Sequence, residues 1–413
     1  MDKMLGIYIH IPFCAGKCSY CDFYSLDGCD GLMPKYQQAL IKHIIETAPQ
    51  MEPYYIDTVY FGGGTPSYYG AKYICELFNT LKRSAKVLRS AEVTVEVNPD
   101  SVTKEDLRMM RSEGINRLSM GVQSANDDIL KLIGRRHNFR QAEQAMKMAR
   151  SEGFDNISID LIYGLPTQSR NDWADTLFKA LAMHPQHMSC YGLKIEEGTP
   201  IEKYKGTDSL PSDDEQADMY LYMTDILQHY DYDQYEISNF AIEGYESKHN
   251  LKYWRLDDYM GFGPGAHSCV GNLRYSFKSD LEGYISGVMN GTEIIDEYEH
   301  IGSLERAAEY IMLGMRTVRG ISKREYFKVY KSGFDRMEYL LSEYQKKGWT
   351  RYNNGRWSFT SSGFLLSNIL IGTLLEAQSQ TKMSANPWIL GSNGQPEPEL
   401  RMPDNEGNYS YRA

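Results

Sequence analysis

Three cysteines stand close together near the N-terminus, in a loop whose spacing suits a metal cluster. Cys14, Cys18 and Cys21 are arranged as Cys-x3-Cys-x2-Cys, directly after an apolar run at 5–11 that ends at a proline. Such a run predicts a buried strand that stops at the proline. Three thiolates on one short loop can hold three corners of an iron–sulfur cubane, although most such clusters take four cysteines. The loop therefore predicts a cluster with one iron open to a ligand that is not protein.

That open iron suits S-adenosylmethionine, whose amine and carboxylate can chelate it for reductive cleavage. Two other interpretations stay open. A structural zinc site needs a fourth ligand, which His10 or Cys29 would have to supply. Three buried thiols without metal would have no reason to share one glycine-containing loop.

The composition limits the kind of protein. The chain has 413 residues, 42% of them hydrophobic, which is enough for one large core or for one large and one small core. The net charge of -11 argues against general binding to nucleic acid or anionic lipid. Seven cysteines, three of them in one motif, fit a reducing compartment. With no signal sequence and no apolar run of about 20 residues, we expect a cytoplasmic protein with at most peripheral membrane contact.

The first half of the chain alternates short apolar runs with amphipathic stretches. The expected strands are 5–11, 58–61, 92–97, 117–120, 156–161 and 187–193, and the expected helices are 34–48, 70–84, 103–112, 126–132, 139–151 and 170–182. Six strand–helix units in a row predict an α/β fold with a parallel sheet. Ligands of such sheets lie at the carboxyl ends of the strands.

Beyond this core we expect three further segments. Residues 1–205 form the core, and 206–301 extend it with one more strand at 235–240. Residues 302–377 form a small, mostly helical module with a hairpin around Asn-Asn-Gly, similar to a winged helix, although the acidic balance argues against DNA. Residues 378–413 are polar and rich in proline, which predicts a disordered or loosely docked tail.

Polar and glycine-rich motifs fall where the expected strands end. Glycines let a backbone approach a ligand closely, and a carboxylate at a strand end can bind ribose hydroxyls. An amide can donate and accept, and a guanidinium can pair with a carboxylate such as that of methionine. The residues concerned are Gly63, Gly64, Thr65, Glu96, Gln123, Arg135 and Asp160. The glycine motif could form a plain strand-to-helix turn, and each of the other four taken singly is equally well a surface group or a helix cap. Their placement on successive strand ends nevertheless predicts a nucleoside site.

A second motif combines an imidazole with aromatic rings. His249, Tyr253 and Trp254 stand in His-Asn-Leu-Lys-Tyr-Trp. Imidazole is a common axial ligand of haem iron, and aromatic faces stack on planar rings. A histidine beside aromatic residues is more often a hydrogen-bonded core residue. The glycine-rich segment 259–268 is expected to be a flexible wall near the cluster, with His267 as a polar contact.

Together these motifs resemble one family closely. The chain from about 5 to 377 resembles the oxygen-independent coproporphyrinogen III oxidase-like family of the radical SAM superfamily. The motifs are Tyr-Ile-His-Ile-Pro-Phe-Cys, Cys-Ser-Tyr-Cys-Asp-Phe, Gly-Gly-Gly-Thr-Pro, Gly-Val-Gln-Ser, Asp-Leu-Ile-Tyr-Gly-Leu-Pro, Tyr-Glu-Ile-Ser-Asn-Phe-Ala, His-Asn-Leu-Lys-Tyr-Trp and Met-Leu-Gly-Met-Arg. The resemblance implies a partial (β/α)6 radical SAM barrel, a [4Fe–4S] cluster and bound S-adenosylmethionine.

Two features separate the branches of this family. The decarboxylating oxidase carries a further cysteine two residues after the third, and here that position is Phe23. The haem chaperone branch carries His-Asn-x-x-Tyr-Trp, which is intact at 249–254. This branch implies haem binding, delivery to respiratory or membrane haem proteins, and a homodimer. An anaerobic oxidase, a radical SAM methyltransferase and a haem-opening enzyme remain alternatives, and a second S-adenosylmethionine site stays doubtful.

The resemblance also assigns residues. It makes Cys14, Cys18 and Cys21 the iron ligands. It places Tyr8, Tyr20, Phe23, Gly63, Gly64, Thr65, Glu96, Gln123, Arg135 and Asp160 around the nucleoside. Nothing carries over to the tail.

Overall fold

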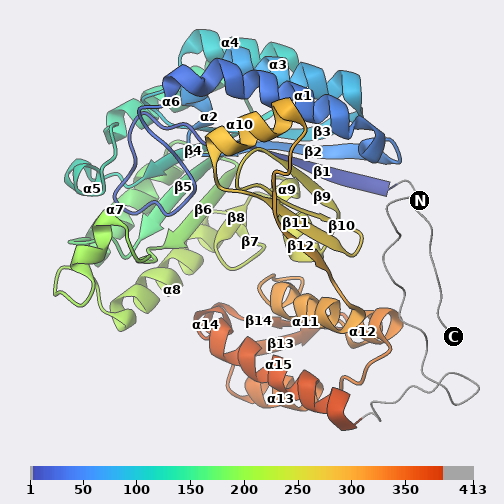
Figure 1. Cartoon of the computed structure of the whole chain (residues 1–413). Helices are drawn as coiled ribbons and strands as arrows, with labels where there is room; N and C mark the ends of the chain where they lie inside the picture. The colour runs from blue at the N-terminus through green and yellow to red at the C-terminus, as the bar shows by residue number, and fades with distance from the viewer. Residues whose placement is uncertain (1–2, 385–413) are drawn as a thin grey trace, which may run out of the picture.

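Six parallel strands form the centre of the molecule, in the order in which they occur along the chain. The computed structural model describes residues 3–384 (Figure 1). The strands are β1 (Lys3–Ile11), β2 (Tyr54–Gly63), β3 (Lys86–Val97), β4 (Arg117–Gln123), β5 (Ile157–Tyr163) and β6 (His187–Gly192). Each pairs in parallel with the next, from β1 to β6. The expected strands and the parallel sheet are confirmed.

Helices connect these strands and cover their outer side. They are α1 (Met33–Met51), α2 (Pro66–Tyr69), α3 (Ala71–Ser84), α4 (Lys104–Glu113), α5 (Asp127–Leu132), α6 (Phe139–Ser151) and α7 (Arg170–Leu181), with a 3-10 turn η1 (Asp30–Leu32) before α1. Figure 1 shows α1, α3 and α4 side by side outside β1, β2 and β3, and α1 contacts α3 as α3 contacts α4. Capping boxes begin α4 at Thr103, α6 at Asn138 and α7 at Ser169. These caps satisfy first-turn N–H groups, so the sequence fixes where the helices start.

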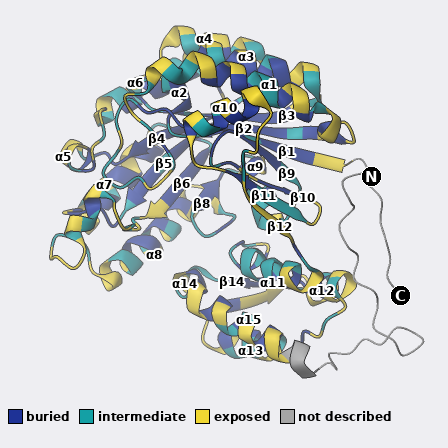
Figure 2. Ribbon diagram, in the orientation of Figure 1, coloured by how far each residue is buried: buried dark blue, intermediate teal, exposed yellow. Residues whose placement is uncertain are grey.

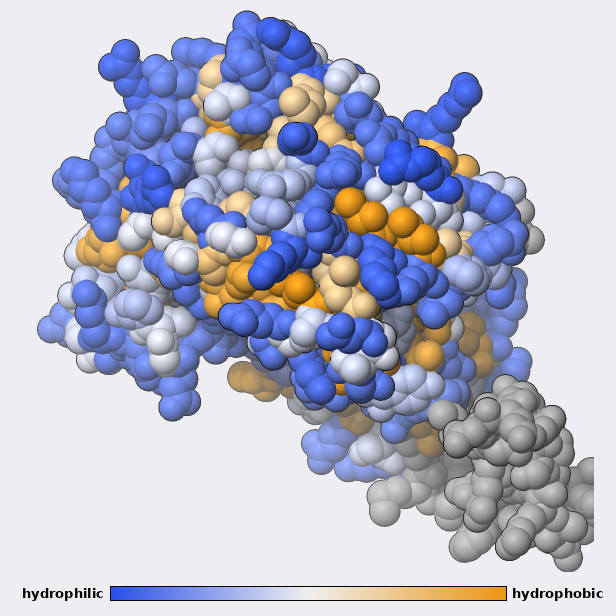
Figure 3. Space-filling model, turned by 45° about the horizontal axis from the view of Figure 1, so that its top comes forward, coloured by the Kyte–Doolittle hydropathy of each residue, from blue (hydrophilic) through white to orange (hydrophobic). Residues whose placement is uncertain are grey.

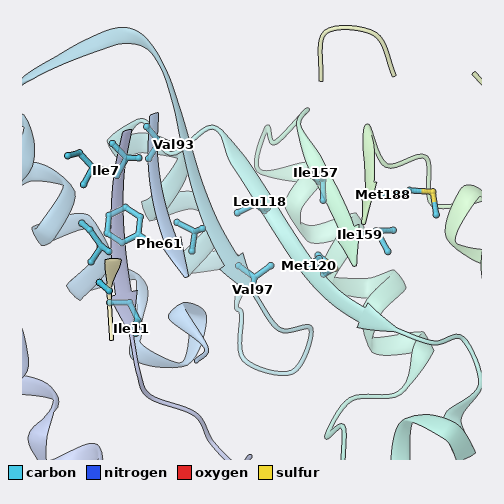
Figure 4. Packing of buried hydrophobic residues seen from close by; sticks show 14 of the residues in the cluster. Ile7, Ile11, Phe61, Val93, Val97, Leu118, Met120, Ile157, Ile159 and Met188 are labelled. Atoms are coloured by element: carbon cyan, nitrogen blue, oxygen red, sulfur yellow. The ribbon is translucent and has the colours of Figure 1, made fainter. Parts of the chain in front are cut away.

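The core lies between the strands and this helical layer. Ile7, Phe61, Leu118, Ile159 and Met188 come from five different strands and have no exposed surface. Figure 4 shows them among the side chains of one cluster, and Figure 2 shows buried strands inside helices whose outer faces are exposed. Burying such side chains stabilises the fold by about 1.5–3 kcal/mol each. The strands are therefore rigid supports for whatever stands at their ends.

Further strands extend the sheet at both edges and leave the barrel open. They are β7 (Asp233–Gln234), β8 (Asn239–Ala241), β9 (Tyr259–Phe262), β10 (His267–Val270), β11 (Leu273–Phe277) and β12 (Ile295–His300), with helices α8 (Asp213–His229), α9 (Lys248–Arg255) and α10 (Leu281–Asn290) and the 3-10 turn η2 (Pro200–Tyr204). The twelve-stranded sheet has the order β12-β11-β10-β9-β1-β2-β3-β4-β5-β6-β8-β7. The expected partial barrel is confirmed.

Two expectations for this extension are wrong. The single strand expected at 235–240 is instead the short antiparallel pair of β7 and β8, with a turn between them. The segment expected as a flexible wall at 259–268 contributes β9, which pairs in parallel with β1, and the start of β10. Pairing with the first strand fixes this segment within the sheet, because its backbone groups enter the ladder.

A small module follows the sheet. It contains α11 (Ser303–Gly314), α12 (Lys323–Tyr330), α13 (Asp335–Lys346), β13 (Thr350–Asn353), β14 (Arg356–Phe359), α14 (Ser361–Leu365) and α15 (Ser367–Ser384). The hairpin is confirmed. Asn354 and Gly355 turn it, with φ values of 49° and 75°, as the common two-residue hairpin turn requires.

The module is fastened to the extension by backbone hydrogen bonds. The N–H of Val318 donates to the Tyr235 carbonyl (3.0 Å), and the N–H of Ile237 donates to the Arg316 carbonyl (3.0 Å). Helix α11 contacts α9, and α14 contacts α8. Figure 1 shows the module on one side of the barrel. The barrel extension and the module therefore share a continuous boundary.

The chain beyond 377 differs in part from the expected tail. Helix α15 continues to Ser384, and the buried Gln378 amide donates to the Tyr326 hydroxyl (3.0 Å). The rest of the expected tail, 385–413, lies outside the described residues. No helix among residues 3–384 is long and apolar enough to cross a bilayer. The face drawn in Figure 3 is mainly hydrophilic, with hydrophobic side chains gathered in patches.

Candidate functional site

A cavity of about 380 Å³ opens at the carboxyl ends of the parallel strands. It brings together residues that are far apart in the sequence. The expected site residues that line it are Cys14, Cys18, Tyr20, Cys21, Phe23, Gly63, Gly64, Thr65, Glu96, Gln123, Arg135 and Asp160. Tyr8, His249, Tyr253, Trp254 and His267 do not line it.

The cysteine loop joins β1 to α1 and is braced from both sides. The N–H of Cys14 donates to the Leu26 carbonyl (2.9 Å), and the N–H of Ser19 donates to the Ile133 carbonyl (3.0 Å). Burial raises the pKa of the Cys14 and Cys21 thiols, so ligation of a metal there must release their protons. All seven cysteines are free thiols, which leaves the three in the loop available as ligands.

These thiols fit a cluster better than a single ion. Among residues 3–384, no three His, Cys, Asp or Glu side chains converge closely enough to hold one metal ion. A cubane binds its cysteines through separate iron atoms, so its ligands surround a volume instead of a point. Cys14, Cys18 and Cys21 all line this cavity, so one cluster inside it could meet all three.

The glycine motif after β2 docks directly on the cysteine loop. The N–H of Gly64 donates to the Ile11 carbonyl (2.7 Å), and that of Thr65 donates to the Phe13 carbonyl (2.8 Å). A Cβ at Gly64 would lie 2.8 Å from the Phe13 carbonyl oxygen, so no larger residue fits without displacing the backbone. The Thr65 hydroxyl also reaches the Cys14 sulfur (3.4 Å). This close backbone approach positions both loops against each other.

Two carboxylates face the cavity from β3 and β5. Glu96 accepts hydrogen bonds from the Tyr60 hydroxyl (2.9 Å) and from the N–H of Gly63 (3.2 Å). Burial, with a smaller contribution from the nearby Asp160, raises its pKa to about 7. Asp160 accepts from the Ser119 hydroxyl (3.0 Å), and burial raises its pKa too. Glu96 can therefore change its charge near neutral pH, which is typical of a functional position.

Arg117, at the start of β4, was not among the expected site residues. Its side chain is 1% exposed and lines the cavity between Glu96 and Asp160, whose pKa values it lowers. Its Nε has no hydrogen-bond partner within residues 3–384. The sequence did offer a signal for Arg117, because it begins an otherwise apolar strand. A cation that is buried in this way needs a nearby anion.

Arg135 is held at the cavity wall by protein groups. Its Nη2 donates to the Gly121 carbonyl (2.5 Å) and to the Asn98 side chain (2.8 Å), and its Nη1 points to the Cys18 sulfur at 3.7 Å. Asn98, which the sequence analysis did not single out, also donates to Thr65 (3.3 Å). The guanidinium thus links the cysteine loop to β3 and β4, and it sets a positive charge beside the Cys18 thiol.

Tyr8 and His249 belong to a buried aromatic stack beneath the cavity. The Tyr60 ring lies 6.3 Å from that of Tyr8 and 5.2 Å from that of His249, with an interplanar angle of 28° in both cases. Both nitrogens of His249 are engaged, Nδ1 with the Thr58 hydroxyl (2.8 Å) and Nε2 with the Tyr253 hydroxyl (2.8 Å). Burial lowers the pKa of His249 to about 3. The imidazole is neutral, and it can bind a metal only after leaving one of these partners.

The residues of the His-Asn-Leu-Lys-Tyr-Trp motif lie on two different faces of α9. His249 is 1% exposed and points to the barrel, where the Glu92 carboxylate accepts its backbone N–H (3.0 Å). Trp254 is half-buried and lines a second cavity, of about 820 Å³, between α9 and the module. His267 is exposed on β10 and lines neither cavity. The structure does not bring these three residues into one site.

Buried neutral histidines make the free energy of unfolding depend on pH. The pKa is lowered by burial, to about 4 for His10, His43 and His137, to about 3 for His249, and well below normal for His187. Below about pH 6.5 the unfolded chain binds protons that the folded chain refuses, so each group costs about 1.4 kcal/mol per pH unit. Four carboxyls whose pKa values burial raises act in the opposite direction but are fewer: Glu96 and Glu236, both raised to about 7, and Asp160 and Asp257. We expect the free energy of unfolding to fall from pH 6.5 to 4.5, as urea denaturation at both pH values would measure. A urea midpoint that is higher at pH 4.5 than at pH 6.5 would contradict the burial of these imidazoles.

Known proteins share both the sequence and the fold. The sequence model of the Radical SAM superfamily matches residues 8–180. The chain is 34% identical to "Heme chaperone HemW" of Bacillus subtilis over 377 residues, which cover 90% of this chain and 99% of that protein. It is 31% identical to "Heme chaperone HemW" of Escherichia coli over 377 residues, covering 90% and 98%.

A solved structure supports the architecture. The coproporphyrinogen III oxidase HemN of Escherichia coli, a radical SAM enzyme, superposes with a TM-score of 0.79 at 23% identity, covering 91% of this chain and 90% of that one. This likeness shows the fold, and the sequence relatives show the branch. The chain therefore belongs to the HemW haem chaperone family of the radical SAM superfamily.

Proposed function

We propose that this protein is a haem chaperone that binds haem, a [4Fe–4S] cluster and S-adenosylmethionine, and that delivers haem to respiratory or membrane haem proteins. The observation that carries the proposal is its near full-length similarity to proteins named "Heme chaperone HemW". The cavity at the strand ends supports it, because its residues match what such a cluster and nucleoside need. We also propose that the protein works as a homodimer in the cytoplasm.

The first part of the proposal concerns the strand-end cavity. Cys14, Cys18 and Cys21 would hold the cluster, which supplies an electron to S-adenosylmethionine when both are bound. Gly63, Gly64 and Thr65 would receive the amino group, with Tyr20, Phe23, Gln123 and Arg135 around it. Glu96 and Asp160 would accept hydrogen bonds from ribose hydroxyls. Tyr8 would support the site indirectly, by packing against Tyr60, which lines the cavity.

The second part concerns haem at α9. The segment contributes Trp254 to the 820 Å³ cavity, and its aromatic face can stack on a flat macrocycle. His249 lies on the other face of α9, so it would ligate the iron through Nε2 only after releasing Tyr253 and after the helix turns toward that cavity. Tyr253 would then be free to contact the bound ring. His267 would be a further polar contact only if the haem reached β10.

Phe23 argues against the decarboxylating oxidase. It stands where that enzyme, by resemblance, has a cysteine. Its ring is 65% exposed and lines the strand-end cavity. A bulky apolar side chain there occupies space next to the nucleoside region and cannot take part in thiol chemistry. We propose that the chain does not convert coproporphyrinogen III.

The test combines haem binding with an activity assay. Anaerobically reconstituted protein should give a Soret band with haem, and His249→Ala should weaken haem binding about tenfold, the loss of a weak axial bond. Tyr253→Phe frees Nε2 without removing the ring, so it should bind haem at least as well as the parent protein. With coproporphyrinogen III, S-adenosylmethionine and a reductant, no protoporphyrinogen IX should form.

The outcomes separate the alternatives. Formation of protoporphyrinogen IX would assign the oxidase activity instead. Release of S-adenosylhomocysteine during turnover would favour a methyltransferase. Equal losses in His249→Ala and Tyr253→Phe would show that the imidazole anchors α9 and does not ligate the iron.

A further inference from the structure

A chain of buried hydrogen bonds joins the strand-end cavity to the second cavity, which lies between α9 and the module. Asp160 lines the strand-end cavity, and Tyr235 lines the second cavity. Between them lie Ser158 and His187, whose side chains have no exposed surface. These four residues form a polar path through the barrel that neither cofactor binding nor packing requires.

The register of the sheet brings the four side chains together. Ser158 and Asp160 are two residues apart on β5, so their side chains point to the same side of that strand. Ser158 is paired with His187 on the neighbouring β6. Tyr235 directly follows β7, in the antiparallel pair that continues the sheet beyond β6. The path is therefore built on rigid strands.

Each link of the path is a hydrogen bond. The Ser158 hydroxyl donates to Asp160 Oδ1 (3.3 Å) and lies 2.7 Å from His187 Nδ1. The other ring nitrogen, Nε2, lies 2.7 Å from the Tyr235 hydroxyl. That hydroxyl also accepts the backbone N–H of Ser247, the residue that caps α9 (3.4 Å).

An ionised Asp160 fixes the direction of every bond. A carboxylate can only accept, so Ser158 donates to it and accepts from His187. His187 is then the Nδ1–H tautomer, and its bare Nε2 accepts the hydroxyl proton of Tyr235. All the donors point toward the strand-end cavity.

Protonation of Asp160 reverses the direction. The carboxyl proton is donated to Ser158, Ser158 donates to Nδ1 of His187, and Nε2 carries the ring proton. The Tyr235 oxygen then accepts from Nε2, so its own proton is free to point into the second cavity. One protonation in the first cavity thus changes which hydrogen-bond donor the second cavity contains.

We propose that Ser158, His187 and Tyr235 form a proton relay that carries the protonation state of Asp160 to the second cavity. As a proton enters, Tyr235 gives its proton to Nε2, Nδ1 gives its proton to Ser158, and Ser158 gives its proton to Asp160. Water in the second cavity restores the Tyr235 hydroxyl. The net change is one proton gained by Asp160. This relay needs neither cluster nor haem, so it stands apart from the proposed function.

The surroundings keep the relay residues neutral while Asp160 titrates. Burial lowers the pKa of His187 well below its usual range, with a smaller contribution from Arg117, and burial raises the pKa of Tyr235. Glu236 is the charged neighbour of Tyr235. The charged and titratable groups near Asp160 are Tyr60, Glu96, Arg117, Cys190 and Tyr191. Among the latter, Glu96 also titrates near neutral pH, but it makes no hydrogen bond to the relay.

Nuclear magnetic resonance can follow both ends of the relay in the full chain. Ring 15N shifts distinguish the two tautomers of His187, and 13C labels in aspartate carboxyls report the protonation of Asp160. From pH 8 to 4.5, His187 should change from Nδ1–H to Nε2–H with the midpoint of Asp160. His137 is the control within the molecule, because its Nε2 is fixed by the Val122 carbonyl (3.1 Å).

Two serine variants separate the relay from general effects on Asp160. Ser119 also donates to Asp160 (3.0 Å), but it makes no hydrogen bond to His187. In Ser119→Ala the midpoints of Asp160 and His187 should rise together, by about one pH unit, because the carboxylate loses a donor. In Ser158→Ala the midpoint of Asp160 should rise likewise, while the tautomer of His187 no longer follows it.

Three results would overturn the relay. The first is a His187 ring that keeps one tautomer while Asp160 titrates. The second is an Asp160 carboxyl that stays ionised down to pH 4.5, and the third is a tautomer change in Ser158→Ala that still follows Asp160. A common midpoint in the parent and in Ser119→Ala, lost in Ser158→Ala, is the expected result.

Discussion

Replacing Cys14, Cys18 or Cys21 singly with alanine should reduce the iron content of anaerobically reconstituted protein from about four atoms per chain to nearly none. All three cysteines line the strand-end cavity, and a cubane with two protein ligands would have two labile corners. The 400 nm absorption and the EPR signal of the reduced cluster should disappear together. Iron analysis and EPR spectroscopy, with and without S-adenosylmethionine, measure this effect.

The chain offers a control for this experiment. Cys29→Ala removes a free thiol from the same connection between β1 and α1, but Cys29 does not line the cavity. Its iron content should equal that of the parent protein. If Cys29→Ala lost iron as the other variants do, a four-cysteine cluster would replace the open one, and the proposed binding of S-adenosylmethionine to iron would fail.

Glu96→Gln should weaken S-adenosylmethionine binding by about 10- to 100-fold, since a hydrogen bond to a charged group is worth about 1.5–3 kcal/mol. In the parent protein the pKa of Glu96 is about 7 because of burial. Protonation removes the negative charge, so affinity should fall as the pH drops from 8 to 6. The variant should show no such dependence. Binding titrations of the cluster-loaded protein at these two pH values measure both effects.

Glu236→Gln provides the matched comparison. Glu236 is 1% exposed, and burial raises its pKa to about 7 as well, but it does not line the strand-end cavity. S-adenosylmethionine should bind this variant with the affinity and the pH dependence of the parent. A loss as large as that of Glu96→Gln would mean that buried charge in general, and not contact with the nucleoside, controls the affinity.

Local sequence patterns predicted the parallel part of the fold well. Apolar runs of β-branched residues, such as those of β2 and β3, need no distant information, because both faces of a parallel strand are buried. The same logic predicted that Gly64, Glu96 and Asp160 would converge, because parallel strands end on one side of a sheet. These predictions depend on order along the chain, which the sequence gives directly.

The features that were missed depend on contacts between distant segments. No pattern in 259–262 shows that β9 pairs with β1, more than 250 residues earlier. The motif in α9 was interpreted as one site, but a helix turns by about 100° per residue, so His249 and Trp254 face different sides. Which side meets the barrel is decided by Glu92 and Thr58, from other strands. Arg117 was missed for the same reason, since its neighbours come from β3 and β5.

The pairing of β9 with β1 also has a consequence for biosynthesis. The strand that carries the cysteine loop keeps one bare edge until residues 259–262 have left the ribosome. Nascent chains shorter than this expose unpaired backbone next to the cysteine loop. We therefore expect the cysteine loop to settle only after residues 259–262 have been synthesised.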